Sequence, residues 1–226
     1  MEIIVISLGG SLVVPEEIDI EFLKSFKALI LEHVAQGKKF VIITGGGKTC
    51  RKYNEAASAI SKLSNYDLDW LGIYSTRFNA EFLHLIFGEE YTEKEIIINP
   101  TLPINFTKPI IIGAGWEPGS STDLDTILIA RNLGARKIIN LSNTDYVYDS
   151  DPKINPNAKK IEKISWSEYR KLIPKDWTSG LNTPFDPIAS KMAEEKGIEV
   201  IIMNGKPIDN LAKCLNGEKF LGTVIS

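Results

Sequence analysis

The chain of 226 residues contains few residues of the kinds that mark secreted, metal-binding or membrane proteins. It has two cysteines, Cys50 and Cys214, and two histidines. Neither cysteine stands in a metal-binding spacing, so we expect two free thiols and a reducing, cytoplasmic compartment. No apolar run approaches the ~20 residues needed to span a bilayer, and the first residues lack the basic start of a signal peptide. We therefore expect neither export nor membrane insertion.

The chain also lacks a large charge of either sign. Its formal net charge is −3, and its hydrophobic content of 43% and charged content of 24% are ordinary for a globular protein. We expect no nucleic-acid partner, because such a chain has no bulk attraction for a polyanion. Any anion site must therefore be local, and small anionic ligands fit better than polymers.

Two common nucleotide-binding motifs, G-x-x-x-x-G-K-[ST] and G-x-G-x-x-G, are absent. The chain has instead three glycine-rich turns, at 9–11, 45–48 and 113–123, each between a β-branched run and a helical pattern. Glycine lets the backbone approach a ligand, and a helix start directs unpaired N–H groups and a positive dipole end at it. A single turn of this kind can serve chain geometry alone. Three on one sheet predict a site for several phosphates.

Short apolar runs alternate with amphipathic stretches along the chain. We expect strands at 2–7, 39–43, 95–98, 109–112, 136–141, 199–203 and 221–225, and helices at about 19–36, 48–63, 69–87, 123–133, 166–172, 187–196 and 207–215. Strands that are apolar on both faces and alternate with helices indicate a mostly parallel sheet covered by helices. This predicts an α/β protein, a three-layer αβα sandwich. The proline-bearing stretches 99–105 and 149–157 are predicted to be loops.

Seven segments in order give the chain a family resemblance. They are SLGGSLVVP (7–15), TGGGKTCRKY (44–53), DWLGIYSTRFNA (69–80), PGSSTD (118–123), DYVYDSDP (145–152), DPIASK (186–191) and GTVI (222–225). The chain resembles the amino acid kinase superfamily from Ile3 to Ile225, and within it the archaeal-type uridylate kinases, which phosphorylate UMP with ATP in pyrimidine nucleotide biosynthesis. The resemblance implies a single domain over residues 1–226, with a UMP-binding part up to about 122 and an ATP-binding part from about 123. It also implies Mg²⁺ on the donor phosphates and a dimer-based homohexamer.

The resemblance assigns residues to three functions. The catalytic residues it implies are Lys191, Asp123, Gly10 and Ser11. The ATP-binding residues are Gly9, Gly10, Gly47, Arg51, Ser142, Tyr148 and Asp151. The UMP-binding residues are Gly46, Asp69, Gly115, Trp116, Glu117, Pro118, Gly119, Ser120, Ser121 and Thr122. The first glycine turn suits the transferred phosphoryl group, because a loose transition state spreads charge over its oxygens and backbone N–H donors stabilise that charge.

Four of these residues carry more specific expectations. Lys191 is expected to be a buried point charge one to two turns inside its helix, where it neutralises charge on the bridging oxygen. Asp123 is expected to cap the helix at 123–133 and, by family position, to orient Lys191. Asp69 is expected to cap its helix and to accept hydrogen bonds from the ribose of UMP. Tyr148 is expected to pack on adenine.

The chain departs from the family pattern at several positions. Ser7 stands where many members carry a lysine, which leaves the phosphoryl-stabilising cation to Lys191, Lys48 or Arg51. Tyr146 stands where relatives have glycine, and its bulk is expected to close or reshape the ATP pocket. Arg77 and Asn79 lie on a helix that the resemblance places partly at the nucleotide site and partly at a subunit interface.

Two alternative functions stay open from the sequence. One is a kinase of another small phosphate or acid in the superfamily. Isopentenyl phosphate kinases normally have a histidine by the second glycine turn, but here Thr44 precedes Gly45 and the only histidines are His33 and His84, which argues against that branch. The missing first-strand lysine argues against amino-acid kinases. The other is a nucleotide-sensing or storage protein that has lost turnover, which Ser7 and Tyr146 favour.

Overall fold

A computed structural model describes residues 2–176, 181 and 183–226 of the chain. The strands are β1 (Ile3–Leu8), β2 (Lys39–Thr44), β3 (Ile110–Gly113), β4 (Lys137–Ser142), β5 (Val147–Tyr148), β6 (Lys160–Ile161), β7 (Lys163–Ile164), β8 (Glu199–Asn204) and β9 (Thr223–Ile225). The helices are α1 (Gly10–Val13), α2 (Ile20–Ala35), α3 (Gly47–Ile60), α4 (Asn65–Phe87), α5 (Thr122–Leu133), α6 (Trp166–Leu172), α7 (Pro187–Lys196) and α8 (Ile208–Leu215).

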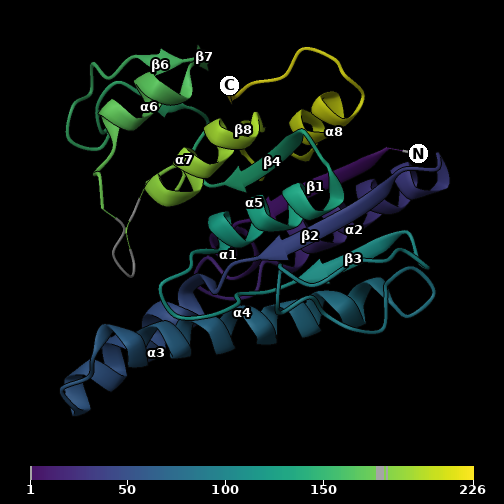
Figure 1. Ribbon diagram of the computed structural model, residues 1–226, viewed down its shortest axis with the longest axis horizontal. Coiled ribbons are helices and arrows are strands. Elements are labelled where there is room, and N and C mark those ends of the chain that lie inside the picture. Colours follow the sequence, from purple (N-terminus) through teal and green to yellow (C-terminus); the bar gives the residue numbers. More distant parts are fainter. Residues whose placement is uncertain (1, 177–180, 182) are drawn as a thin grey trace.

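A seven-stranded sheet organises the molecule, in the order β3-β2-β1-β4-β8-β9-β7 (Figure 1). Its strand pairs are parallel except for β8 with β9. Strands β5 and β6 form a separate antiparallel pair. The predicted α/β class and mostly parallel sheet are confirmed.

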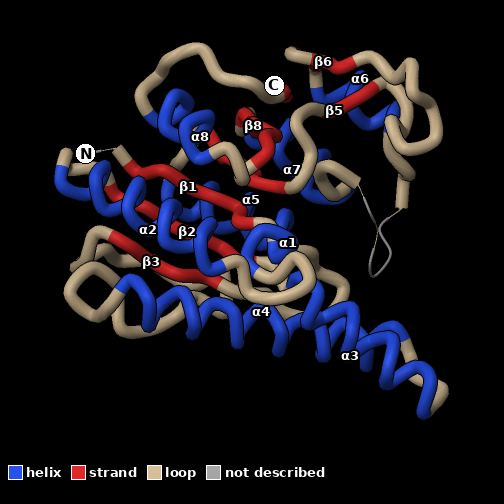
Figure 2. The backbone as a smooth tube through the Cα atoms, turned by 180° about the vertical axis from the view of Figure 1, so that it is seen from behind, coloured by secondary structure: helices blue, strands red, loops and turns tan. Residues whose placement is uncertain are grey.

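Each central strand is apolar on both faces because helices cover the sheet from both sides. Ile6, Ile42 and Ile139 pack with buried side chains of α2, α4 and α8. Their neighbours on the opposite face, such as Val5 and Val41, pack with α5, α6 and α7. Helices α5 and α7 lie in front of the strands in Figure 1, and α2 and α8 lie in front of them in Figure 2. The molecule is therefore the predicted αβα sandwich.

The strand register places the carboxyl ends of five strands at one edge of the sheet. Leu8 pairs with both Thr44 and Leu141, Ile43 pairs with Gly113, and Ser142 pairs with Asn204. The loops that follow β1, β2, β3 and β4 therefore leave the sheet side by side. In open parallel sheets this edge is where ligands bind.

Helices α4 and α5 begin earlier than the sequence predicted, and in both a serine is the N-cap. Helix α4 begins after Ser64, whose hydroxyl accepts from Asp67 N–H at 3.2 Å while Ser64 N–H donates to the Asp67 carboxylate at 3.0 Å. Helix α5 begins after Ser121, whose hydroxyl accepts from Leu124 N–H at 3.1 Å. The predictions that Asp69 and Asp123 cap these helices are therefore wrong, since both lie inside them. Serine in an extended conformation satisfies the first free N–H groups before either aspartate is reached.

The segment between α4 and β3 is irregular. The predicted strand at 95–98 is wrong, because Ile97 makes only an isolated bridge with Gly113. Glu93 instead joins the two ends of this segment, because its carboxylate accepts hydrogen bonds from the Thr107 hydroxyl and from Lys108 N–H. Residues 99–105 contain turns, which confirms that this proline-bearing stretch is not a helix. The short elements α1, β5, β6 and β7 were not predicted.

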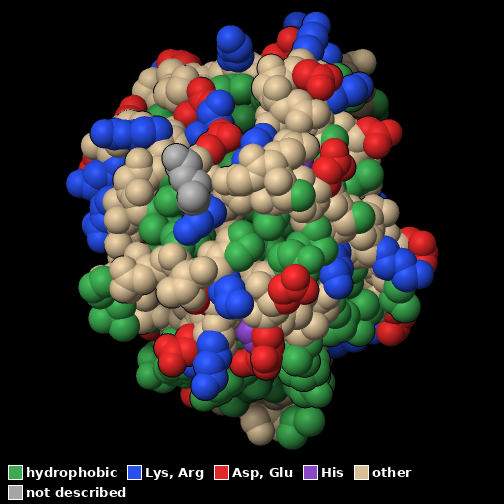
Figure 3. Space-filling view, turned by 90° about the vertical axis from the view of Figure 1, so that its right-hand side faces the viewer, with side chains coloured by type: hydrophobic (Ala, Val, Ile, Leu, Met, Phe, Trp, Pro, Cys, Tyr) green, Lys and Arg blue, Asp and Glu red, His purple; other side chains and the backbone are tan. Residues whose placement is uncertain are grey.

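Other caps at the carboxyl half agree with the prediction. Ser165 caps α6 by accepting from Glu168 N–H, and Asp186 caps α7 by accepting from Ala189 N–H. Gly197 ends α7 in the left-handed conformation. Among the described residues, no helix is both long and apolar enough to cross a membrane. Figure 3 shows one face of the molecule, on which basic and acidic side chains are interspersed.

Candidate active site

The first two glycine turns are in direct contact at the sheet edge. A Cβ added to Gly10 would meet the backbone N of Gly47 and would lie 2.6 Å from the backbone C of Gly45. Gly47 has φ +65°, which other residues rarely adopt, and a Cβ there would lie 2.5 Å from the Gly10 carbonyl oxygen. Neither position therefore accepts a side chain. The close contact joins the starts of α1 and α3 into one backbone surface.

Hydrogen bonds fix these two turns to their neighbours. Gly9 N–H donates to Leu141 O of β4 at 2.8 Å, and Gly45 N–H donates to Leu8 O at 3.0 Å. The buried side chain of Asn79 donates from α4 to Gly45 O at 2.8 Å. Asn79 therefore supports the second turn from behind. Ser11, in the first turn of α1, is half-buried beside these glycines.

The third glycine turn, residues 115–121, is tied to α4 by three side chains. Thr76 accepts from Gly115 N–H at 2.8 Å, and Asp69 accepts from Gly119 N–H at 3.0 Å. Arg77 donates to the Trp116 carbonyl at 2.9 Å. The 115–121 loop and the helix that carries Asp69 therefore form one unit. Gly119 has φ +85°, so the turn at the tip of the loop requires glycine.

The same loop is tied to α5 by a residue that the sequence analysis missed. Asp125 is fully buried, and its two carboxylate oxygens accept from Trp116 N–H at 3.1 Å and from the Ser120 hydroxyl at 2.6 Å. Burial is the largest cause that raises the pKa of Asp125 to about 7, and the negative charges of Glu117 and Asp186 add to it. The signal available in the sequence was that Asp125 lies close to the apolar run from Ile127 to Ala130 in the same helix.

Asp123 lies beside the starts of both α5 and α7. It accepts a hydrogen bond from Asp186 N–H at 3.0 Å. Burial and the nearby Asp186 carboxylate raise the pKa of Asp123 to about 7, while hydrogen bonds from Asp186 N–H and from Ser7 oppose this shift. Burial also raises the pKa of Asp186. Ser7, the residue that departs from the family pattern, thus reaches the carboxylate implied in catalysis.

The three cations implied by the sequence lie on two helices, Lys191 on α7 and both Lys48 and Arg51 on α3. Lys191 lies in the second turn of α7 and is exposed, so the prediction that it is buried is wrong. The buried positions of α7 are Pro187, Ala189, Ser190 and Ala193, and Lys191 falls off that face. Arg51 is exposed on α3. Lys48 forms an ion pair with Glu16 at 3.3 Å.

Three of the residues implied in ATP binding, Ser142, Tyr148 and Asp151, lie on β4 and on the hairpin that follows it. Ser142 ends β4, and its hydroxyl accepts from Thr144 N–H at 3.2 Å. Tyr148 is half-buried in β5 and meets the ring of Tyr146 edge to face at 6.4 Å between centroids. Tyr146 is buried under the Lys160 ammonium, 4.8 Å from its ring centroid. Asp151 is exposed and accepts from Lys153 N–H at 2.9 Å.

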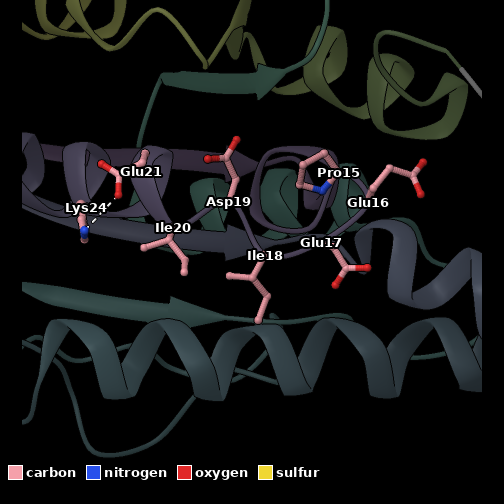
Figure 4. Close-up of a pocket in the computed structure, with 8 residues that line it drawn as sticks. All are labelled: Pro15, Glu16, Glu17, Ile18, Asp19, Ile20, Glu21 and Lys24. Carbon is pink, nitrogen blue, oxygen red and sulfur yellow. Dashed lines mark hydrogen bonds and ion pairs between the residues drawn. The ribbon is translucent and has the colours of Figure 1, made fainter.

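One hollow of the surface lies beyond the first two turns, and its Glu16 forms the ion pair with Lys48. It has a volume of about 740 Å³ and is lined by residues 15–21 and Lys24, from the segment that leads into α2 and from the first turns of α2 (Figure 4). Four of its lining side chains are acidic, Glu16, Glu17, Asp19 and Glu21. Acidic side chains disfavour a phosphate ligand. The glycine turns, and not this hollow, are therefore the candidate site.

No group of three or more His, Cys, Asp or Glu side chains among the described residues could hold a metal ion. A divalent cation that arrives on nucleotide phosphates needs few protein ligands. The arrangement suits a ligand that brings its own metal. Two neighbouring backbone turns and the start of α5 offer N–H donors to more than one phosphate.

Comparison with known proteins gives consistent results. Residues 2–204 match the amino acid kinase family. Uridylate kinase from Pyrococcus abyssi is 35% identical over 224 residues, covering 98% of each chain, and that from Thermoplasma acidophilum is 36% identical over 234 residues, covering 99% of this chain and 96% of the relative. The crystal structure of uridylate kinase from Archaeoglobus fulgidus is similar over the full length of both chains, with a TM-score of 0.82 and 31% identity.

Proposed function

Because the chain belongs to the amino acid kinase family, we propose that it is a nucleoside monophosphate kinase that transfers the terminal phosphoryl group of ATP to UMP. The products are UDP and ADP, and the reaction belongs to pyrimidine nucleotide biosynthesis. The near full-length similarity to uridylate kinases supports this reading over a kinase of another small acid. A sensor without turnover is the alternative that Ser7 and Tyr146 still favour.

One observation carries the proposal: the packed pair of glycine turns formed by Gly10 and Gly47 stands beside the 115–121 loop at one sheet edge. The paired turns place N–H groups around a phosphoryl group in transfer, where such donors stabilise charge without reorganisation. The 115–121 loop lies next to them and takes the acceptor phosphate. This arrangement fits a donor and an acceptor that meet in line.

We assign the two halves of the chain to the two nucleotides. Residues up to about 122 bind UMP, with Gly46, Asp69 and the 115–121 loop in contact with it. The part from about 123 binds ATP through the strand ends at Ser142 and Tyr148. Mg²⁺ arrives on the ATP phosphates and neutralises their charge. Lys191 supplies the cation for the transferred group, since a long exposed side chain on α7 can extend to a ligand at the helix start.

The direct test is a coupled assay of ADP release with ATP, Mg²⁺ and a panel of acceptors. UMP should be preferred over CMP, AMP and isopentenyl phosphate. Equal or faster turnover with isopentenyl phosphate or an amino acid would contradict the proposal. Tight binding of UMP and ATP without ADP release would identify the sensor alternative instead.

We also propose a homo-oligomer built from dimers and a cytoplasmic location. Tyr66, Trp70 and Tyr74 form a continuous aromatic row on α4, with Arg77 over the last two rings. Tyr74 and Phe78 are 60% and 71% exposed, which suits a surface that a second copy covers. Sedimentation velocity measures the assembly, and a monomer at micromolar concentration would contradict it. The free thiols of Cys50 and Cys214 fit a reducing compartment.

A further inference from the structure

Asp125 joins both ends of a short loop segment to a rigid helix. It lies in the first turn of α5, and its side chain is fully buried. Trp116 N–H and the Ser120 hydroxyl both donate to it. An ionised carboxylate is costly to bury, and a neutral side chain could make the same bonds at less cost. We therefore infer that the Asp125 carboxylate beneath this loop has a function other than stabilising the fold.

The direction of the hydrogen bond between Ser120 and Asp125 decides whether the Ser120 hydroxyl can donate to a bound anion. While Asp125 is ionised it can only accept, so the Ser120 O–H must donate its hydrogen bond to Asp125. The hydroxyl then presents lone pairs to the site, which repel a phosphate. When Asp125 carries a proton, it can donate to the Ser120 oxygen, and the Ser120 O–H is free to donate outward.

We propose that Asp125 is a positioning residue of the acceptor site, which holds the 115–121 loop and, in the molecules where it is ionised, takes up a proton from solvent when the acceptor phosphate binds. This inference rests on the proposed function of the loop. The proton goes to one carboxylate oxygen, and the Ser120 hydroxyl turns its own proton to a phosphate oxygen. The one covalent bond that forms is the O–H bond of Asp125, and the Ser120 O–H only rotates.

The charged groups around Asp125 favour this uptake. Asp123 lies on the same helix, Asp186 lies at the start of α7, and Glu117 lies on the loop, so all three are acidic neighbours. Arg77 from α4 is bonded to the Trp116 carbonyl. A bound phosphate adds negative charge to this group. The pKa of Asp125, already about 7, would rise further, so protonation near neutral pH needs little free energy.

Binding of UMP to four variants tests the positioning role. Asp125→Ala and Ser120→Ala should weaken UMP binding by roughly tenfold or more, as expected for lost hydrogen bonds to a charged group, with ATP affinity unchanged. Asp125→Asn keeps a side chain that can bond to both partners, so it should stay within a few fold of wild type. Asn210→Ala is the matched control. Asn210 is buried on α8 and makes two hydrogen bonds to Leu221, at the other side of the sheet.

Calorimetric titration of UMP at pH 7.5 in two buffers of different ionisation heat counts the protons. Wild type should take up a fraction of a proton per UMP bound, and Asp125→Asn should take up less. The titration of UMP's own phosphate is common to both proteins, so the difference belongs to Asp125. Equal proton uptake in the two proteins, or unchanged UMP affinity in Asp125→Ala, would overturn the inference.

Hydrogen exchange separates this inference from the proposed function. If wild type neither binds nor phosphorylates UMP, the proposed function fails, and exchange of the 115–121 amides then decides the role of Asp125. Faster exchange in Asp125→Ala and Ser120→Ala, but not in Asp125→Asn or Asn210→Ala, supports the positioning role. If the 115–121 amides of Asp125→Ala exchange at the wild-type rate, the positioning role is overturned.

Discussion

Stability of this protein should fall as the pH rises from about 5 to about 8, and Asp125→Asn should remove a measurable part of that fall. The cause is the buried carboxyl group, whose pKa is raised from 3.8 to about 7 on folding. Such a group binds a proton more readily in the folded state than in the unfolded state. Its contribution to stability is therefore complete below about pH 4 and is lost as the pH rises to about 7.

The magnitude follows from the shift. Each unit of pKa difference corresponds to about 1.4 kcal/mol. For a pKa of 3.8 in the unfolded state and about 7 in the folded state, the loss between pH 5 and pH 8 is roughly 2.5 kcal/mol. A domain of this size changes its melting temperature by roughly 2–4 °C per kcal/mol, so the loss corresponds to roughly 5–10 °C.

Equilibrium unfolding in urea at pH 5, 6, 7 and 8 measures the effect. The free energy of unfolding of Asp125→Asn, relative to wild type, should rise by roughly 2.5 kcal/mol across this range. Asn210→Ala, which changes no titratable group, should run parallel to wild type. A difference between Asp125→Asn and wild type that stays constant with pH would refute the raised pKa and, with it, the proton uptake proposed above.

Two further results are expected from the proposed division of the site. Lys191→Ala should lower kcat by about a hundredfold or more with UMP affinity within a few fold, because its charge is needed most in the transition state. If this variant kept the wild-type kcat, the role of the phosphoryl-stabilising cation would be assigned to Lys48 or Arg51 instead. Asp69→Asn should weaken UMP binding by roughly 1–3 kcal/mol and spare ATP, and Tyr148→Ala should do the reverse. Calorimetry gives the four affinities, and two variants that weaken the same nucleotide would contradict the division.

The fold was predictable where a segment carries its own pattern. The strands around Val5 and Val41 are apolar on both faces because helices cover both, and that pattern is visible in the sequence. Segment 95–98 also contains three successive isoleucines, yet its single bridge to Gly113 depends on how the chain from α4 packs on β3. Strand β7 pairs with β9, some 60 residues later in the chain, and no local pattern contains that pairing.

The site was predictable where glycine geometry decides it. Gly10 and Gly47 had to be glycine because their backbones touch, and the sequence marks both. The supports of the 115–121 loop were less visible. Arg77 and Asp125 act on backbone groups whose direction is fixed only when the loop has folded. Lys191 was expected to be buried, but the small residues of α7 take the buried face and leave it outside.

Ser7, which stands where many members of the family carry a lysine, affects the charge of the buried acids beside it. A lysine at that position would stand beside Asp123 and would hold its pKa low. With serine there, the charges that act most strongly on Asp123 are those of Asp186 and Asp125, and both raise its pKa. Near neutral pH the buried carboxyl groups of Asp123 and Asp125 are therefore partly protonated, which lowers the negative charge that two nucleotide phosphates would meet. In the proposed site, protons on Asp123 and Asp125 would therefore lower the negative charge that a lysine at position 7 would otherwise offset, in addition to the cation supplied from another helix.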